Sequence, residues 1–186
     1  RRKDIRHMIG YVPLEPDMDP WLTLEQNMRF NGLLYGVDNS TISNRIAEYS
    51  SRLDLFDFLH YPANSVSYGN LKKSTIVRAL VHDPTILILD EPTAALDAAT
   101  EHRVMSNLTT WVREAHGESG QPQGRAIFLI THRISTIRRA DNILYLDSGR
   151  IVESGDHETL MQIENGRYRR FVESESNLTN RSESHV

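Results

Sequence analysis

The sequence predicts an α/β protein whose parallel sheet carries a charged site at one edge. Residues 86–89 form a continuous apolar run, which is typical of a strand in a parallel sheet that is covered on both faces. Strand-like and helical segments alternate through the second half of the chain. Asp90 and Glu91 follow the run directly, and ligands of such sheets bind outside the carboxyl ends of the strands.

The first half of the chain is predicted to be mostly helical. A short strand over residues 5–13 leads into a loop over 14–22, and Pro13 just before the loop, with Pro16 and Pro20 within it, disfavours a helix there. Thr23 is a suitable N-cap for the next helix, and either Ser40 or Thr41 for the one after it. The helices are predicted over residues 25–35, from the second cap to about 58, and over about 69–82.

The second half returns to α/β alternation. The predicted elements are a strand over 85–90, a helix over 97–116, a strand over 126–131, a short helix over 134–140, a hairpin over 142–154 and a helix over 156–174. Residues 117–124 are rich in turn formers and are predicted to be an exposed loop. Residues 175–186 are polar, and we expect a disordered tail there.

The composition excludes several classes of protein. A net charge of −4 argues against nucleic acid as the main ligand, so no nucleic-acid partner is expected. The absence of cysteine excludes a disulfide framework and is compatible with a reducing cytosol. No run approaches the roughly 20 apolar residues that span a bilayer, so membrane association is expected to come through a partner. No histidine pair has metal-ligand spacing, and we predict no zinc site.

Two adjacent carboxylates at a strand end suggest a division of roles. One carboxylate can hold Mg²⁺ through its water shell while its neighbour orients a water molecule for attack on phosphorus. We assign Asp90 to the metal and Glu91 to the water, as the catalytic base. Taken alone, the pattern also fits a buried strand followed by two surface acids.

The residues around this pair carry a wider pattern. Residues 91–97, E-P-T-A-A-L-D, resemble the joined Walker B and D-loop segments of ABC-type ATPases, the nucleotide-binding domains of ABC transporters. Other matches follow the family's order over roughly residues 5–173. They are I-G-Y-V-P at 9–13 before the Q-loop, V-S-Y-G-N at 66–70 for the L-S-G-G-Q signature, V-R-A-L at 77–80 for the helix after it, I-T-H-R at 130–133 for the switch histidine loop, and G-R-I-V-E-S-G-D-H at 149–157 for the closing hairpin.

The resemblance implies a partial P-loop NTPase core, RecA-like and of the ABC type, with an inserted helical subdomain. One partial ATPase domain would then cover residues 1–174, followed by the tail over 175–186. Within it, the helical subdomain would cover about 23–83, and the core about 5–13 and 84–174.

The resemblance also implies ATP and Mg²⁺ as ligands. It supports Asp90 as the metal residue and Glu91 as the base, and it makes His132 the switch that contacts the γ-phosphate. His132 follows an apolar strand at the edge where the nucleotide would lie, which suits a hydrogen bond to phosphate. His157 is instead expected to be a cap or a hairpin contact.

The signature and D-loop matches imply a contact with a second subunit. Ser67 and Gly69 would bind the nucleotide held by that subunit, and Asp97 would lie at the dimer seam. Tyr68 and Asn70 replace a glycine and the glutamine of the signature, and the phenol ring would crowd the nucleotide. We therefore expect a weak composite site in an asymmetric dimer; the alternative is that Tyr68 tilts aside and the site works normally.

Two further departures weaken the match. No G-x-x-x-x-G-K-[ST] phosphate loop, the Walker A motif, occurs in these 186 residues, although the family carries it upstream of the Q-loop strand. We expect a fragment, a truncated product or a divided domain that binds ATP very weakly by itself. Leu14 stands where the Q-loop glutamine would reach the metal and the water, which an aliphatic side chain cannot do.

The expected function is that of the ATP-hydrolysing subunit or domain of an ABC transporter, with export favoured by the closing stretch of the sequence. Its expected partners are a second nucleotide-binding domain, in a homo- or heterodimer, and a transmembrane permease domain. The chain would then lie at the cytoplasmic face of a membrane, with Met18, Trp21 and Leu22 as a docking patch or simply packed on the helices. Alternatives are a non-hydrolytic regulatory remnant and a soluble ATPase of DNA repair or translation.

Overall fold

The protein is described by a computed structural model over residues 2–94, 96–114 and 124–183. The chain divides into two compact units, Arg1–Ile130 and Thr131–Val186, which we call unit 1 and unit 2. Each unit has its own apolar core, and each is described by itself. Of the loop predicted over residues 117–124, all but Gly124 lies outside the described residues.

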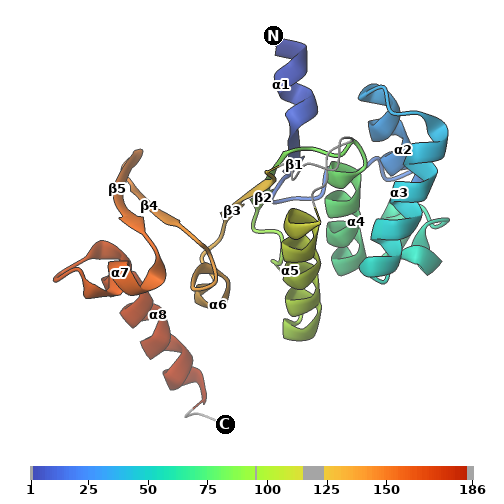
Figure 1. The fold of residues 1–186 in the computed structure, drawn as a ribbon. Coiled ribbons are helices and arrows are strands. Elements are labelled where there is room, and N and C mark those ends of the chain that lie inside the picture. The colour runs from blue at the N-terminus through green and yellow to red at the C-terminus, as the bar shows by residue number, and fades with distance from the viewer. Residues whose placement is uncertain (1, 95, 115–123, 184–186) are drawn as a thin grey trace. The chain divides into compact units, whose positions relative to one another are not determined.

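Unit 1 is built on a three-stranded parallel sheet with strand β2 in the centre (Figure 1). The predicted α/β class is therefore confirmed. Leu87 and Leu89 of β2 are fully buried, whereas Ile86 and Ile88 are only partly buried, so one face of the strand is covered less completely than the continuous apolar run predicted. The strands are β1 (Ile9–Val12), β2 (Ile86–Asp90) and β3 (Ala126–Ile130).

The start of the chain differs from its prediction. A strand was predicted over residues 5–13, but helix α1 (Arg2–Met8) precedes the shorter β1. Pairing with β2 starts only at Ile9, opposite Ile86. The residues before Ile9 include Arg6, whose positive charge suits the last turn of a helix.

The next helices begin at side-chain caps. Thr23 caps α2 (Leu24–Leu34) as predicted, and Gln26 completes a capping box by accepting from the Thr23 N–H. The cap of α3 (Asn39–Arg52) is Asp38 rather than Ser40 or Thr41, because the Asp38 carboxylate accepts from the Thr41 N–H at 2.9 Å.

Helix α3 also ends earlier than predicted. It stops at Arg52, and Asp54 takes a left-handed backbone conformation with φ of 49°, which breaks the helical path. Two short 3₁₀ turns follow, η1 (Phe56–Phe58) and η2 (Ala63–Ser65), and lead to the next long helix.

Helix α4 (Tyr68–Leu80) packs on both α2 and β1. The approach to β1 is close at Gly10, where an added Cβ would lie 2.7 Å from the Ala79 carbonyl oxygen. Helix α5 (Ala98–Arg113) connects β2 to β3 and contributes Val104, Leu108 and Trp111 to the same core. The sheet is therefore anchored by helices that begin near its carboxyl edge.

Unit 2 combines a hairpin with short helices. Strands β4 (Ile143–Asp147) and β5 (Arg150–Gly155) pair antiparallel across Ser148 and Gly149, which both have positive φ. Ile143, Leu160, Tyr168 and Val172 form its core. Its helices are α6 (Ile134–Ile137), α7 (His157–Gln162) and α8 (Arg167–Glu183).

The single helix predicted over residues 156–174 is two helices. Asn165 has a positive φ of 58° between them, and the Glu153 carboxylate accepts from the N–H groups of Arg167 and Tyr168 at the start of α8. The backbone of α8 continues as helix to Glu183, past the predicted end at 174, through a proline-free sequence. No helix within the described ranges is long and apolar enough to cross a membrane.

Candidate functional site

Asp90 and Glu91, the predicted metal residue and the predicted catalytic base, follow each other at the carboxyl edge of the sheet in unit 1. Asp90 is the last residue of β2, and Glu91 leaves the strand with φ of 43°, in the left-handed region. The Glu91 N–H donates to the Ile130 carbonyl at 2.9 Å, and the Glu91 carbonyl accepts from the Ala94 N–H at 3.0 Å. These backbone bonds hold an uncommon conformation at a residue assigned to chemistry, a combination that is frequent in active sites.

The surroundings of the pair are firmly packed. Asp90 and Glu91 are half-buried, and the next residues, Pro92 and Thr93, are buried. Leu96 is buried too, and its N–H donates to the Thr93 carbonyl at 3.1 Å. The two carboxylates are thus followed by a buried segment, while they themselves remain partly exposed and accessible to a ligand.

The donor set fits a magnesium ion that is shared with phosphate. Within the described part of the chain, no three or more histidine, aspartate or glutamate residues gather into a metal site. Mg²⁺ is commonly held by one or two carboxylates, with substrate phosphates and waters completing its shell. The Asp90 carboxylate at the end of β2 suits that role, and the ion would supply charge neutralisation there.

A buried lysine lies next to the carboxyl edge of the sheet, and it was not identified as a candidate residue from the sequence. Lys72 in α4 is 0% exposed, and its Nζ donates to the Pro13 carbonyl at 2.9 Å, to the Leu14 carbonyl, and to the Asp90 carbonyl at 3.5 Å. Burial lowers the pKa of the Lys72 ammonium, while nearby carboxylates, Glu15 first among them, raise it. No local pattern could reveal Lys72, because two of its acceptors lie 58 and 59 positions away in the chain.

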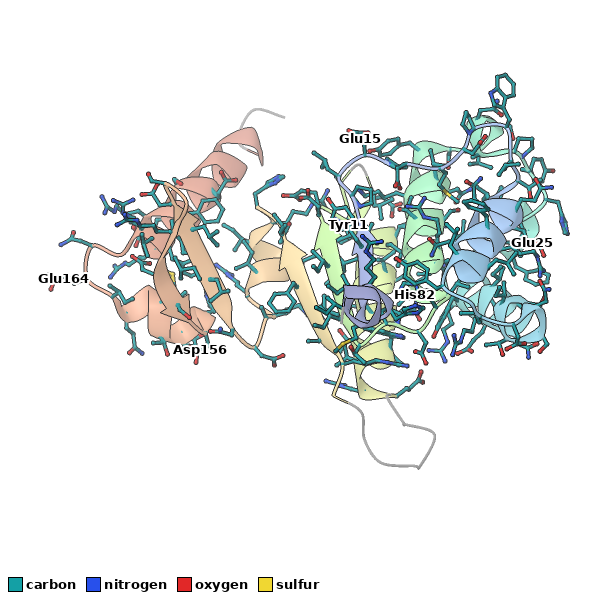
Figure 2. All side chains as sticks on the ribbon, turned by 90° about the horizontal axis from the view of Figure 1, so that it is seen from above. Tyr11, Glu15, Glu25, His82, Asp156 and Glu164 are labelled. Atoms are coloured by element: carbon teal, nitrogen blue, oxygen red, sulfur yellow. The ribbon has the colours of Figure 1, made fainter. Side chains whose placement is uncertain are left out.

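Two further side chains of α4 reach the segment that leaves β1. The Tyr68 hydroxyl donates to the Glu15 carboxylate at 3.2 Å, and Glu15 is labelled on this segment in Figure 2. Burial first, and then the bond to Glu15, raise the pKa of Tyr68. Arg78 donates to the Asp17 carbonyl at 3.0 Å and pairs with the Asp17 carboxylate. The Tyr68 hydroxyl is therefore directed toward a residue of its own chain, and both interpretations of Tyr68 at the signature stay predictions.

The signature residues lie at the start of α4. Ser67 is exposed and caps the helix by accepting from the Asn70 N–H at 3.2 Å. A Cβ added at Gly69 would lie 3.3 Å from Leu96 Cδ2, so the start of α4 is next to the segment that leads to α5. The structure thus brings Gly69 close to Leu96, in the segment that follows Glu91.

Asp97 is the N-cap of α5. Its carboxylate accepts from the N–H groups of Ala99 and Thr100, both at 3.0 Å, and from the Thr100 hydroxyl at 2.6 Å. The Thr100 bonds hold the pKa of Asp97 below its usual range. The exposed Asp97 therefore has a structural role in the monomer, which the sequence assignment to a dimer seam did not include.

His132 belongs to unit 2, whereas Asp90 and Glu91 belong to unit 1. It lies two residues after Ile130, the end of β3, and its side chain is exposed. The Arg133 N–H donates to the Thr131 hydroxyl at 3.1 Å, which turns the backbone around His132. The contact of His132 with a γ-phosphate stays a prediction.

The comparisons with known proteins decide the family. A profile described as ABC transporter matches residues 1–94, half of the chain. The chain belongs to the ABC transporter family. This ABC transporter chain is 34% identical over 183 residues to ABC transporter B family member 26, chloroplastic, of Arabidopsis thaliana, and the match covers 94% of this chain and 24% of that protein.

Other relatives agree with this assignment. The chain is 43% identical over 103 residues to the leukotoxin translocation ATP-binding protein of Mannheimia haemolytica, covering 55% of this chain and 13% of that protein. It therefore spans at most about a quarter of the curated relatives named here. A solved ATP-binding subunit of an ABC transporter matches with a TM-score of 0.75 and 25% identity, over 87% of this chain and 64% of that one.

Two more solved structures share the fold. A bacterial Atm1-family ABC exporter with ATP bound matches with a TM-score of 0.75 and 24% identity, over 94% of this chain and 29% of that one. A dimeric ATP-binding cassette in a post-hydrolysis state, bound to ADP and Pi, matches with a TM-score of 0.71 and 26% identity, over 83% and 65% of the two chains. The predicted ABC-type fold is thus confirmed, whereas the roles of single site residues and the domain boundaries stay predictions.

Proposed function

We propose that this chain is the part of an ABC exporter ATPase that supplies the metal carboxylate, the catalytic base and the signature residues. The observation that carries this proposal is the geometry of Glu91, whose left-handed backbone is tied to β3 directly beside Asp90. A base for phosphoryl transfer has to be held in place relative to the water it orients, and such catalysis consists mostly of positioning and electrostatics.

We assign some of these residues to the nucleotide bound by this subunit and others to the nucleotide bound by the second subunit. Asp90 would hold Mg²⁺, Glu91 would accept the proton of the attacking water, and His132 would donate to the γ-phosphate. Ser67 and Gly69 at the start of α4 serve the nucleotide bound by the second subunit, since helix N-termini favour phosphate. Asp97 lies at the seam between the two subunits.

The partners follow from the same proposal. A second nucleotide-binding domain is supported by the dimeric, ADP-bound structure that shares the fold. A transmembrane domain, and with it a place at the cytoplasmic face of a membrane, is supported by the leukotoxin translocation relative. Trp21 is 81% exposed, and this exposure supports Trp21 as part of a docking patch over its packing on the helices, whereas Met18 packs against the core of unit 1.

The decisive test is Mg²⁺-dependent ATP hydrolysis, measured for this chain alone and mixed with a nucleotide-binding subunit that carries a phosphate loop. We expect activity in the mixture, and we expect Glu91→Gln to lower kcat by about 10²- to 10⁴-fold, the range typical of a lost general base, with little change in ATP binding. Glu48→Gln is the matched control, because Glu48 is an exposed carboxylate in α3 that pairs with Arg52. Normal turnover in Glu91→Gln would show that another group is the base.

A second candidate is a regulatory module that docks without hydrolysing ATP. It is favoured by Leu14, whose aliphatic side chain is 45% exposed and can neither coordinate a metal ion nor hydrogen-bond a water molecule. This candidate would be favoured if the wild-type chain hydrolysed no ATP, either alone or in the mixture, and still bound the second subunit stably.

A further inference from the structure

Lys72 makes contacts that are unusual for a lysine. Its side chain is completely buried in α4, although fully buried lysines are rare unless they are paired. An ammonium has three N–H donors, and Lys72 has three carbonyl acceptors, on Pro13, Leu14 and Asp90. The polar needs of the group are thus met entirely by backbone oxygens.

These three acceptors lie at the ends of two different strands. Pro13 and Leu14 follow the end of β1, and Asp90 is the end of β2. Tyr68 and Arg78 bind Glu15 and Asp17 of the same segment from the same helix (Figure 2 labels Glu15). Lys72 alone among these three residues of α4 reaches β2 as well, so it connects the helix, the segment after β1 and the carboxylate-bearing edge.

We propose that Lys72 is a positioning residue that fixes the ends of β1 and β2 to α4 and thereby holds the Asp90–Glu91 turn in its hydrolysis-competent geometry. This inference rests on the proposed function for its catalytic consequence. Lys72 touches backbone oxygens, so it acts through Asp90 and Glu91 and makes no contact with nucleotide.

The neighbouring residue provides a matched control. Lys73 is also buried in α4 and also donates to two backbone carbonyls, those of Leu53 at 2.9 Å and Asp54 at 3.4 Å. These carbonyls lie at the end of α3, away from the ends of β1 and β2. Removal of either ammonium leaves buried carbonyls without a donor, so both variants should be destabilised, but at different places.

The test is residue-resolved amide hydrogen exchange of the full 186-residue chain. In Lys72→Met we expect the Glu91 and Ala94 amides to exchange at least about tenfold faster than in wild type, while the Leu53 and Leu55 amides near the end of α3 change less than about threefold. In Lys73→Met we expect the reverse pattern. Lys72→Arg, which keeps the cation and several donors, should return the Glu91 and Ala94 rates to within about threefold of wild type.

Uniform acceleration in both lysine variants would overturn the proposal, because it would reduce Lys72 to ordinary core packing. If Lys72→Met does not fold, Lys72→Gln replaces it, since the amide keeps two of the donors; an unchanged Glu91 amide in folded Lys72→Gln would also overturn the proposal.

Hydrolysis measurements separate this inference from the proposed function. With the second subunit present, Lys72→Met should lower kcat about tenfold while KM stays within about twofold, and Lys73→Met should leave kcat per folded chain within about twofold. Equal kcat losses in both variants would overturn the positioning role. If wild type does not hydrolyse ATP, the proposed function fails, and the exchange pattern still decides whether Lys72 fixes the strand ends.

Discussion

At the scale of single residues, the contact of Tyr68 with Glu15 bears on whether its ring obstructs the nucleotide at the signature. Its hydroxyl binds Glu15 of its own chain, which directs the ring toward the segment after β1. We therefore expect Tyr68→Gly to change ATP turnover per folded chain by less than about twofold, and to lower stability by about 1 kcal/mol because glycine is a poor helix former. Steady-state hydrolysis with thermal melting checks both expectations, and turnover that rises severalfold would show that the ring obstructs the nucleotide.

Single residues also show what the sequence could and could not reveal. Asp90 and Glu91 were identified because they are adjacent and directly follow an apolar strand, which is local information. Lys72 was not, because its importance depends on carbonyls that only the fold brings near. The cap role of Asp97 could have been inferred, since an aspartate at the start of a predicted helix is a common N-cap.

At the scale of elements, the predicted order of helices and strands was confirmed through most of the described chain, but several boundaries were wrong. Thr23 has Gln26 three residues later, so its capping box is recognisable in the sequence. Asp38, Ser40 and Thr41 are all suitable caps within four positions, so local preference could not choose among them. The split between α7 and α8 depends on Glu153, which lies on another element and binds the start of α8.

The packing of β1 on α4 leads to a prediction about Gly10. An added methyl group would meet the Ala79 carbonyl oxygen at 2.7 Å and Leu87 Cδ1 at 2.9 Å, and the backbone oxygen cannot move without displacing α4. We expect Gly10→Ala to lower the free energy of unfolding by about 1–3 kcal/mol, as overpacking commonly does. Urea unfolding measures the change, with Gly124→Ala as the control because nothing lies within 4 Å of a Cβ there. Equal midpoints for the two variants would contradict the close approach.

At the scale of the whole molecule, both units depend on aspartate caps. Asp38, Asp97 and Asp156 cap α3, α5 and α7, and hydrogen bonds from residues in the first turn of each helix lower the pKa of all three below the usual 3.8. A lowered pKa in the folded state means that the unfolded chain binds the proton more tightly. The stability contributed by these caps is therefore present above about pH 4 and is lost as the pH falls through the lower folded-state pKa.

The combined variant Asp38→Asn, Asp97→Asn and Asp156→Asn tests this dependence. Asparagine caps helices well but does not titrate, so the variant should lose less stability than wild type between pH 5 and about pH 2.5. Unfolding midpoints in urea across that range provide the measurement. Parallel acid profiles for the two proteins would assign the acid sensitivity to other carboxylates.

Two separate requirements act on substitutions at Glu91: the new residue must adopt the left-handed backbone, and its side chain must act in hydrolysis. Left-handed φ is tolerated by glycine and asparagine and strongly disfavoured for valine, isoleucine and threonine, whatever the chemistry of the side chain. A deep mutational scan that measures abundance first and ATP hydrolysis second should therefore sort these substitutions at position 91 into two groups. Branched residues lose abundance, whereas glycine and asparagine keep abundance but lose ATP hydrolysis.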